Sequence, residues 1–205
     1  MSEPVTSLED RASYAVGRQL GENLAREPFA GMKPEAVLAG MADALAGRPS
    51  PVSADKLNEA IDDLNRRTQE KLNSTAQENA TTGEAFLAEN AKRDEVQLSE
   101  SGLQYEVLNE GEGDSPELSS RVKVHYHGTL IDGSVFDSSV DRGQPIDFPV
   151  SGVIPGWTEA LQLMSPGAKY KLYIPHQLAY GEAGAGDVIK PNTTLIFEVE
   201  LLEIL

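Results

Sequence analysis

The chain has no cysteine among its 205 residues. That absence excludes disulfide bonds, thiolate nucleophiles and zinc sites built on cysteine. Basic residues are also scarce, because 17 lysines and arginines stand against 33 aspartates and glutamates, which gives a formal net charge of −16. The negative charge is spread over both halves of the sequence. Since a polyanion would be repelled by such a surface, we expect no binding to nucleic acid.

Long apolar runs are missing as well. None approaches the roughly 18 residues that a membrane-spanning helix needs, so we expect no membrane partner. The opening residues Met1-Ser2-Glu3-Pro4 carry neither the basic nor the apolar segment of a signal peptide. These observations lead us to expect a cytoplasmic location. The mixture of 40% hydrophobic and 24% charged residues is that of an ordinary globular protein.

Residues 1–95 have the apolar spacing of three to four that indicates amphipathic helices. A first stripe of apolar residues spans residues 8–24 and a second spans residues 37–45. A third begins at Leu57, behind Ser53, whose side chain can cap a helix. The first half of the chain is therefore predicted to consist of three helices.

The third predicted helix covers about residues 53–95, roughly 60 Å at 1.5 Å per residue. Its second half is mostly polar, so we expect that half to stand in solvent. The first two helices are short and rich in alanine and glycine, and alone they would bury too little apolar surface to hold together. We therefore predict a helical dimerisation domain over residues 1–95, which packs against a second copy in a symmetric homodimer. The alternative is that these helices fold back on the second half of the same chain.

From Ser101 onward the apolar spacing changes to two, as in half-buried strands. Residues 122–126 and 195–201 both alternate between apolar and polar side chains. One short helix is expected from Trp157 to about Met164, before a proline–glycine pair. A single helix among several antiparallel strands predicts an α+β domain over residues 96–205.

A small group of residues in this domain suggests a pocket. The alternation places Tyr126 on the core side, where a tyrosine normally needs a partner for its hydroxyl. Asp137 is a candidate partner, and Arg142 can pair with that aspartate, which would keep it ionised at the rim of an apolar pocket. The alternative is a surface ion pair of little consequence. Trp157, the only tryptophan, ends the stretch Val-Ile-Pro-Gly-Trp and is either a packed corner or the floor of that pocket.

Three longer segments resemble the FK506-binding peptidyl-prolyl isomerases, the FKBP family. They read VHYHGTLIDGSVFDSSVDRGQPIDFPV, GVIPGWTEALQLMSPG and LAYGEAGAGDVIKPNTTLIFEVELLEI, and they lie in the order and spacing of that family. The resemblance covers about residues 101–205. The helical first half is similar to the N-terminal part of bacterial dimeric members, the Mip-like proteins and the cytoplasmic FKBP22-type enzymes.

The resemblance implies an FKBP domain, in which a curved antiparallel sheet wraps around one short helix and Trp157 forms the floor of the pocket. It also implies a peptidyl-prolyl cis-trans isomerase (rotamase) that assists protein folding by acting on X–Pro bonds of unfolded or proline-containing clients. The macrolides tacrolimus and rapamycin would inhibit it, and no cofactor or metal is expected. Carried over motif by motif, the catalytic residues are Tyr126, Phe136, Asp137, Phe148, Trp157, Tyr180 and Phe197. The substrate-binding residues are Arg142, Ile146, Val153, Ile154 and Ile189.

Some positions depart from the family pattern. Ile146 stands where the best-known members have an aromatic residue, Pro155 replaces a common polar residue, and Lys190 replaces the first proline of Ile-Pro-Pro. We expect these changes to alter substrate preference and inhibitor affinity. We also expect the two pockets of a dimer to hold one unfolded client by avidity, as a chaperone does. The rival interpretation is a binding module that clasps proline-containing segments or a partner protein with little catalysis.

Overall fold

The computed structural model describes residues 6–205 and contains two compact units, one up to Glu70 and one from Lys71 to Leu205. Helix α3 (Ala54–Asn90) passes from the first unit into the second. The predicted domain boundary after residue 95 rests on the change of periodicity and stays a prediction. The stretch Met1–Pro4, for which we expect no signal peptide, lies outside the described residues. Within residues 6–205, none of the helices combines the length and the apolar character that crossing a bilayer requires.

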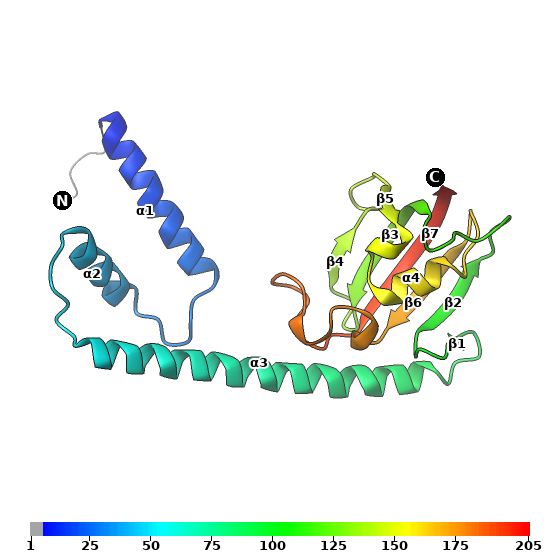
Figure 1. Cartoon of the computed structure of the whole chain (residues 1–205), viewed down its shortest axis with the longest axis horizontal. Helices are drawn as coiled ribbons and strands as arrows, with labels where there is room; N and C mark the ends of the chain where they lie inside the picture. Colours follow the sequence, from blue (N-terminus) through cyan, green and yellow to red (C-terminus); the bar gives the residue numbers. More distant parts are fainter. Residues whose placement is uncertain (1–5) are drawn as a thin grey trace. The chain divides into compact units, whose positions relative to one another are not determined.

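The first unit contains α1 (Leu8–Arg26), α2 (Pro34–Leu45) and the beginning of α3 (Figure 1). Both short helices begin at recognisable signals. The Ser7 Oγ accepts a hydrogen bond from the Asp10 N–H at 3.0 Å, and the Asp10 carboxylate accepts one from the Ser7 N–H at 3.0 Å, which is a capping box. A proline opens the first turn of α2, where its missing N–H costs nothing. The predicted N-terminal helices are confirmed.

The apolar faces of α1 and α2 are uncovered within one chain. Across the described residues of these two helices, none is buried. The exposed fraction is 60% for Val16, 45% for Leu20 and 65% for Leu38. A hollow of about 590 Å³ lies between the two helices and is lined mainly by apolar side chains. Contiguous apolar surface of this kind is typical of an interface.

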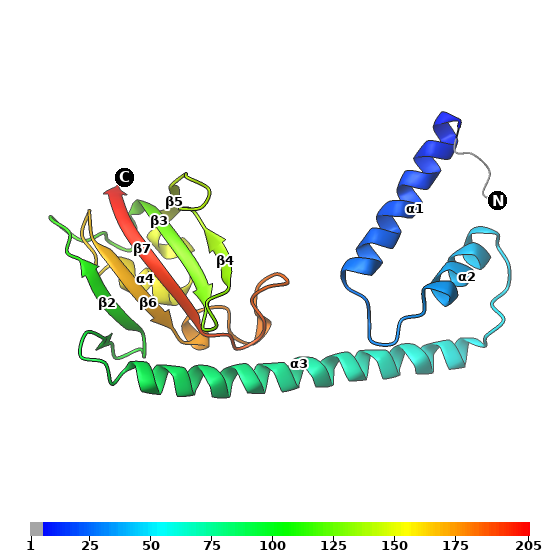
Figure 2. The ribbon, with the colours of Figure 1, turned by 180° about the vertical axis from the view of Figure 1, so that it is seen from behind.

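The second unit is built around an antiparallel sheet (Figures 1 and 2). Its strands lie in the order β1-β2-β6-β7-β3-β4, and β5 pairs separately with β3. The strands are β1 (Gln97–Leu98), β2 (Gln104–Asn109), β3 (Arg121–Leu130), β4 (Val135–Ser138), β5 (Ile146–Pro149), β6 (Lys169–Ile174) and β7 (Leu195–Ile204). Helix α4 (Pro155–Leu161) covers one face of the sheet, and Figure 2 shows the opposite face. The predicted α+β arrangement is confirmed, with the helix two residues earlier at its start because Pro155 is well suited to a first helical turn.

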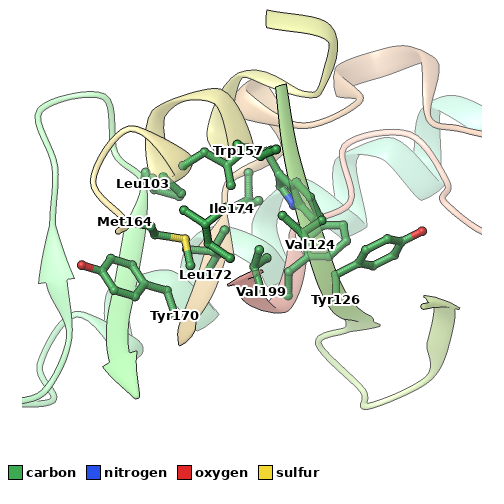
Figure 3. Packing of buried hydrophobic residues seen from close by; sticks show 14 of the residues in the cluster. Leu103, Val124, Tyr126, Trp157, Met164, Tyr170, Leu172, Ile174 and Val199 are labelled. Carbon is green, nitrogen blue, oxygen red and sulfur yellow. The ribbon is translucent and has the colours of Figure 1, made fainter. Parts of the chain in front are cut away.

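The hydrophobic core of this unit lies between α4 and the sheet (Figure 3). Val122 and Val124 are fully buried on one side of β3, as the two-residue period of a strand requires. Leu172 of β6 and Val199 of β7 bring further buried side chains from the neighbouring strands, and Trp157 of α4 covers them with an exposed fraction of 4%. Burying an aliphatic side chain of this size stabilises the fold by roughly 1.5–3 kcal/mol.

The second half of α3 packs against the sheet unit, so our expectation that it stands in solvent is wrong. Gly83 and Asn90 are buried. The Phe86 ring lies 6.0 Å from the ring of Tyr173 in β6, and the Asn90 Nδ2 donates a hydrogen bond to the Gln104 Oε1 of β2 at 2.8 Å. The covered face repeats at three to four residues and consists of Ala76, Asn79, Ala80, Gly83, Phe86, Leu87 and Asn90. Because most of these side chains are small or are amides, the apolar stripe is too thin to distinguish a packed face from a solvated one.

Candidate active site

An open cavity of about 740 Å³ lies beside α4, and this volume is typical of ligand pockets. It gathers all the predicted site residues except Ile189. Its walls are formed by Tyr126, Phe136, Asp137, Arg142, Ile146, Phe148, Gly152, Val153, Ile154, Trp157, Tyr180 and Phe197. Residues from β3, β4, β5, α4 and β7 thus meet at one place. The catalytic or substrate-binding role of each stays a prediction.

Two positions differ between the predicted set and the described cavity wall. Ile189 belongs to the hydrophobic core instead, with an exposed fraction of 7%, and its backbone pairs with Ala185. Gly152 lines the cavity and was not predicted. A Cβ at that position would lie 2.6 Å from the Pro149 Cγ, so the tight turn leaves no room for a side chain there. In the sequence, the only indication that Gly152 lines the cavity is its position directly before Val153 and Ile154.

The floor of the cavity is the indole of Trp157. The backbone N–H of Trp157 donates a hydrogen bond to the Ile154 carbonyl at 2.9 Å in the first turn of α4, which fixes where the side chain leaves the helix. Three rings stand nearly perpendicular to the indole, with centroid distances of 5.1 Å for Phe197, 5.4 Å for Tyr126 and 5.9 Å for Phe148. Edge-to-face pairs of this kind are favoured by the ring quadrupoles. The tryptophan both packs on the core and lines the cavity, so both interpretations of its motif hold.

A polar group occupies one rim of the cavity. The Tyr126 hydroxyl points away from the core cluster in Figure 3 and donates a hydrogen bond to the Asp137 Oδ2 at 2.5 Å. The Arg142 Nη2 donates to the same tyrosine oxygen at 2.9 Å, and Arg142 also forms an ion pair with Asp137. Burial acts to raise the pKa of the Asp137 carboxyl, but the hydrogen bonds from Tyr126 and Arg142 outweigh it, and the pKa is lowered. The aspartate is therefore ionised at neutral pH, and the predicted contacts are confirmed.

Phe136 and Phe197 form a further wall of the cavity. Their rings are perpendicular at a centroid distance of 5.3 Å. Gly128 of β3 lies directly beneath them, because a Cβ there would be 2.7 Å from the Phe136 Cζ and 2.8 Å from the Phe197 Cε1. Only a residue without a side chain leaves room for both rings, which the sequence alone did not suggest. Tyr180, with an exposed fraction of 40%, completes the cavity.

Comparison with known proteins accounts for almost the whole chain. Residues 113–202 match the family model for the FKBP-type peptidyl-prolyl cis-trans isomerase, and residues 9–107 match the model for the domain amino terminal to it. The FKBP-type 22 kDa peptidyl-prolyl cis-trans isomerase of Escherichia coli K12 is 51% identical over 199 residues, 97% of each protein. The chain belongs to the FKBP-type peptidyl-prolyl cis-trans isomerases.

Further relatives of this FKBP-type chain match it over nearly its full length. FkpA of Aeromonas hydrophila is 44% identical over 97% of this chain and 77% of its own. The crystal structure of FkpA from Escherichia coli is similar with a TM-score of 0.70 at 37% identity, over 98% of both chains. The predicted family, fold class and isomerase activity are confirmed by these matches. The amino-terminal family model extends into β2, so it includes the half of α3 that packs on the sheet.

Proposed function

We propose that the ring-walled cavity catalyses rotation about the X–Pro bond of protein clients, with the proline ring held over Trp157. The observation that carries this proposal is a largely apolar cavity whose floor and walls are perpendicular aromatic rings. Rotation about a peptide bond is slow because amide resonance must be broken, at a barrier of roughly 18–20 kcal/mol. It neither makes nor breaks a covalent bond. The reaction itself therefore calls for no nucleophile, metal or cofactor.

The apolar character of the cavity supplies the catalytic effect. A peptide bond twisted out of plane has lost its conjugation and is less polar than the planar form. Water favours the planar form, whereas an enclosure of rings removes that advantage and so favours the transition state. Lowering the barrier by about 5–8 kcal/mol would accelerate rotation by roughly four to six orders of magnitude. The Tyr180 hydroxyl and the Ile154 N–H are the donors that we assign to the flanking carbonyls of the substrate.

The polar rim positions the wall of the cavity and does not transfer protons. Asp137 is held ionised by the hydrogen bonds from Tyr126 and Arg142, which lower its pKa. An acid or base catalyst would instead need a pKa near neutrality. These contacts fix the orientation of the Tyr126 ring, which stands nearly perpendicular to the indole floor. Ile146 adds an aliphatic patch to the wall, and through it we expect weaker contact with the macrolides tacrolimus and rapamycin, which we propose as inhibitors.

An activity assay separates this proposal from a proline-binding module. The full chain is added to a short X–Pro peptide in a protease-free isomerisation assay, with tacrolimus titrated against it. We expect acceleration that tacrolimus abolishes, and a loss of at least about tenfold in kcat/KM for Phe197→Ala, which removes the ring nearest the floor. Binding of the peptide without acceleration would instead favour the binding module. A change of Trp157 fluorescence on adding the peptide reports binding in either case.

We also propose that two copies of the chain associate through α1 and α2. The uncovered apolar faces of these helices and the hollow between them support a second copy as the partner. Fully covering a side chain such as Val16 or Leu38 contributes up to roughly 1.5–3 kcal/mol to association. Two cavities in one assembly would then hold a client at two sites, which raises its apparent affinity. A cytoplasmic location is likewise our proposal, and cell fractionation tests it.

Sedimentation equilibrium tests the dimer with the full chain, whose monomer mass is 22.1 kDa. We expect twice that mass for the wild-type protein and dissociation on dilution for Leu38→Glu, which places a charge in the apolar face. Gln77→Glu is the matched control, since Gln77 is exposed and belongs to the second unit, not to α1 or α2. A wild-type protein that sediments as a monomer at micromolar concentration contradicts the proposal.

A further inference from the structure

Helix α3 contacts the segment of chain that leads into one wall of the cavity. We call residues 181–194 the rim segment. They connect Tyr180, which lines the cavity, to the start of β7. The Asn79 Nδ2 of α3 donates a hydrogen bond to the Pro191 carbonyl at 2.8 Å. In the opposite direction, the Asn192 Nδ2 donates to the Ala76 carbonyl at 3.4 Å. The amide side chains of Asn79 in α3 and Asn192 in the rim segment therefore both connect the helix to the rim segment.

A glycine in the same face of α3 brings the two backbones close together. Gly83 is buried in the helix interior, where glycine is an unfavourable helix former. A Cβ at this position would lie 2.3 Å from the Thr194 Oγ1 and 3.2 Å from the Thr194 Cβ. The close approach accounts for the glycine, because any larger residue would push Thr194 away. Thr194 directly precedes β7, which carries Phe197 into the cavity wall.

A backbone hydrogen bond within the rim segment connects the anchored Asn192 to the residue that follows Tyr180. Asn192 has a φ of 56°, a left-handed conformation that no other non-glycine residue within 6–205 adopts. Asparagine is among the few residues that tolerate it. In that conformation the Asn192 N–H donates a hydrogen bond to the Gly181 carbonyl at 2.8 Å. Gly181 follows Tyr180, whose side chain lines the cavity at an exposed fraction of 40%.

We infer that the face of α3 formed by Ala76, Asn79 and Gly83 positions the rim segment and, through it, the Tyr180 hydroxyl at the cavity. Asn79 is a positioning residue, because it touches the rim segment and is not part of the cavity wall. The inference rests on the proposed isomerase function. It gives this half of α3 a part in the active site in addition to its link with the first unit.

The test uses full-length variants in the peptide assay. Asn79→Ala removes both donors of the amide, and the exposed Gln77→Ala on the same helix is the control. Loss of one such hydrogen bond shifts the rim segment between ordered and displaced forms by about two- to tenfold, and we expect kcat/KM to fall by that factor. In a Tyr180→Phe background the same substitution should have little further effect, because the hydroxyl that it positions is already gone.

A compensating pair separates positioning from a loss of folding. Gly83→Ala should lower kcat/KM by pushing Thr194, and adding Thr194→Ala, which removes the Oγ1 in closest contact, should restore part of that loss. Hydrogen exchange supplies a readout that is independent of catalysis, since the Asn192 N–H should exchange faster in Asn79→Ala than in Gln77→Ala. Faster exchange supports the inference even if the wild-type protein proves not to be an isomerase.

Two results overturn the inference. One is a kcat/KM for Asn79→Ala equal to that of Gln77→Ala with unchanged exchange at Asn192. The other is an equal loss from Asn79→Ala with and without the Tyr180 hydroxyl, which would mean that the helix acts on the site by another route. A wild-type protein without activity would remove the proposed function, and the exchange measurement would then decide alone whether α3 holds the rim segment.

Discussion

Replacing Gly128 with alanine places a methyl group under two walls of the cavity. Gly128 lies in β3 directly opposite Phe197 of β7. The added Cβ would be 2.7 Å from the Phe136 Cζ and 2.8 Å from the Phe197 Cε1. Carbon atoms in contact are ordinarily about 3.5–4.0 Å apart, so each ring must move by about 1 Å. The perturbation therefore acts on the cavity walls while leaving every polar group of the site in place.

We expect Gly128→Ala to lower both the stability and the catalytic rate, and these two effects can be measured separately. Overpacking of this kind destabilises a protein by about 1–3 kcal/mol. A displacement of about 1 Å at a catalytic surface lowers the rate by up to about 100-fold. We therefore expect Gly128→Ala to fold with a lower Tm and to show a kcat/KM about 10- to 100-fold below that of the wild-type protein in the peptide assay.

Leu103→Val is the control for stability alone. Leu103 is fully buried in the core and is not part of the cavity wall. Losing one buried methylene costs about 1 kcal/mol, and kcat/KM should stay at the wild-type value when both variants are assayed well below their Tm. The reasoning is refuted if Gly128→Ala is destabilised to a similar degree and yet catalyses at the wild-type rate. The two rings would then not be the catalytic surface.

Two further predictions concern pH. Hydrogen bonds from Tyr126 and Arg142 lower the pKa of Asp137 against the opposing effect of burial, so its contribution to stability is present above the ordinary pKa of about 4 and is lost as the pH falls through the lowered value. Asp137→Asn should flatten the acid end of a urea-unfolding series, and an unchanged acid limb would contradict this. Burial, followed by the hydrogen bond to Glu106, raises the pKa of Tyr173 from its ordinary value of 10.0 to about 12. Its contribution is complete below pH 10 and is lost as the pH rises toward 12, so Tyr173→Phe should unfold with a shallower alkaline decline, and an equally steep decline would refute this.

Much of the fold follows from local patterns in the sequence. The stripes of α1 and α2 and the alternation in β3 are periodic signals that tertiary contacts do not override. The contact between Tyr126 and Asp137 could be inferred because a buried hydroxyl needs a partner and Asp137 follows Phe136 in an apolar context. The meeting of residues from five elements at one cavity could not be read from spacing, and there the resemblance to a known family supplied the set.

The features that sequence reasoning missed depend on close approach between distant segments. Gly83 and Gly128 matter because of what lies opposite them, Thr194 and two aromatic rings respectively, and a glycine in a sequence does not name its neighbour. The motif assigns Ile189 to the cavity, whereas the structure buries its side chain in the core and leaves it outside the described cavity wall. The polar second half of α3 similarly looked like a solvated helix until its amides were seen to meet the sheet unit.

Exchange NMR on a short peptide that contains a single X–Pro bond tests the catalytic role of the cavity most directly, with the full chain present in catalytic amounts. We predict exchange cross-peaks between the cis and trans forms at mixing times of a second or less, and their disappearance when tacrolimus fills the space above Trp157. Uncatalysed exchange at such a proline takes tens to hundreds of seconds. Peaks that stay at this slow rate while the indole fluorescence reports a bound peptide would contradict the account.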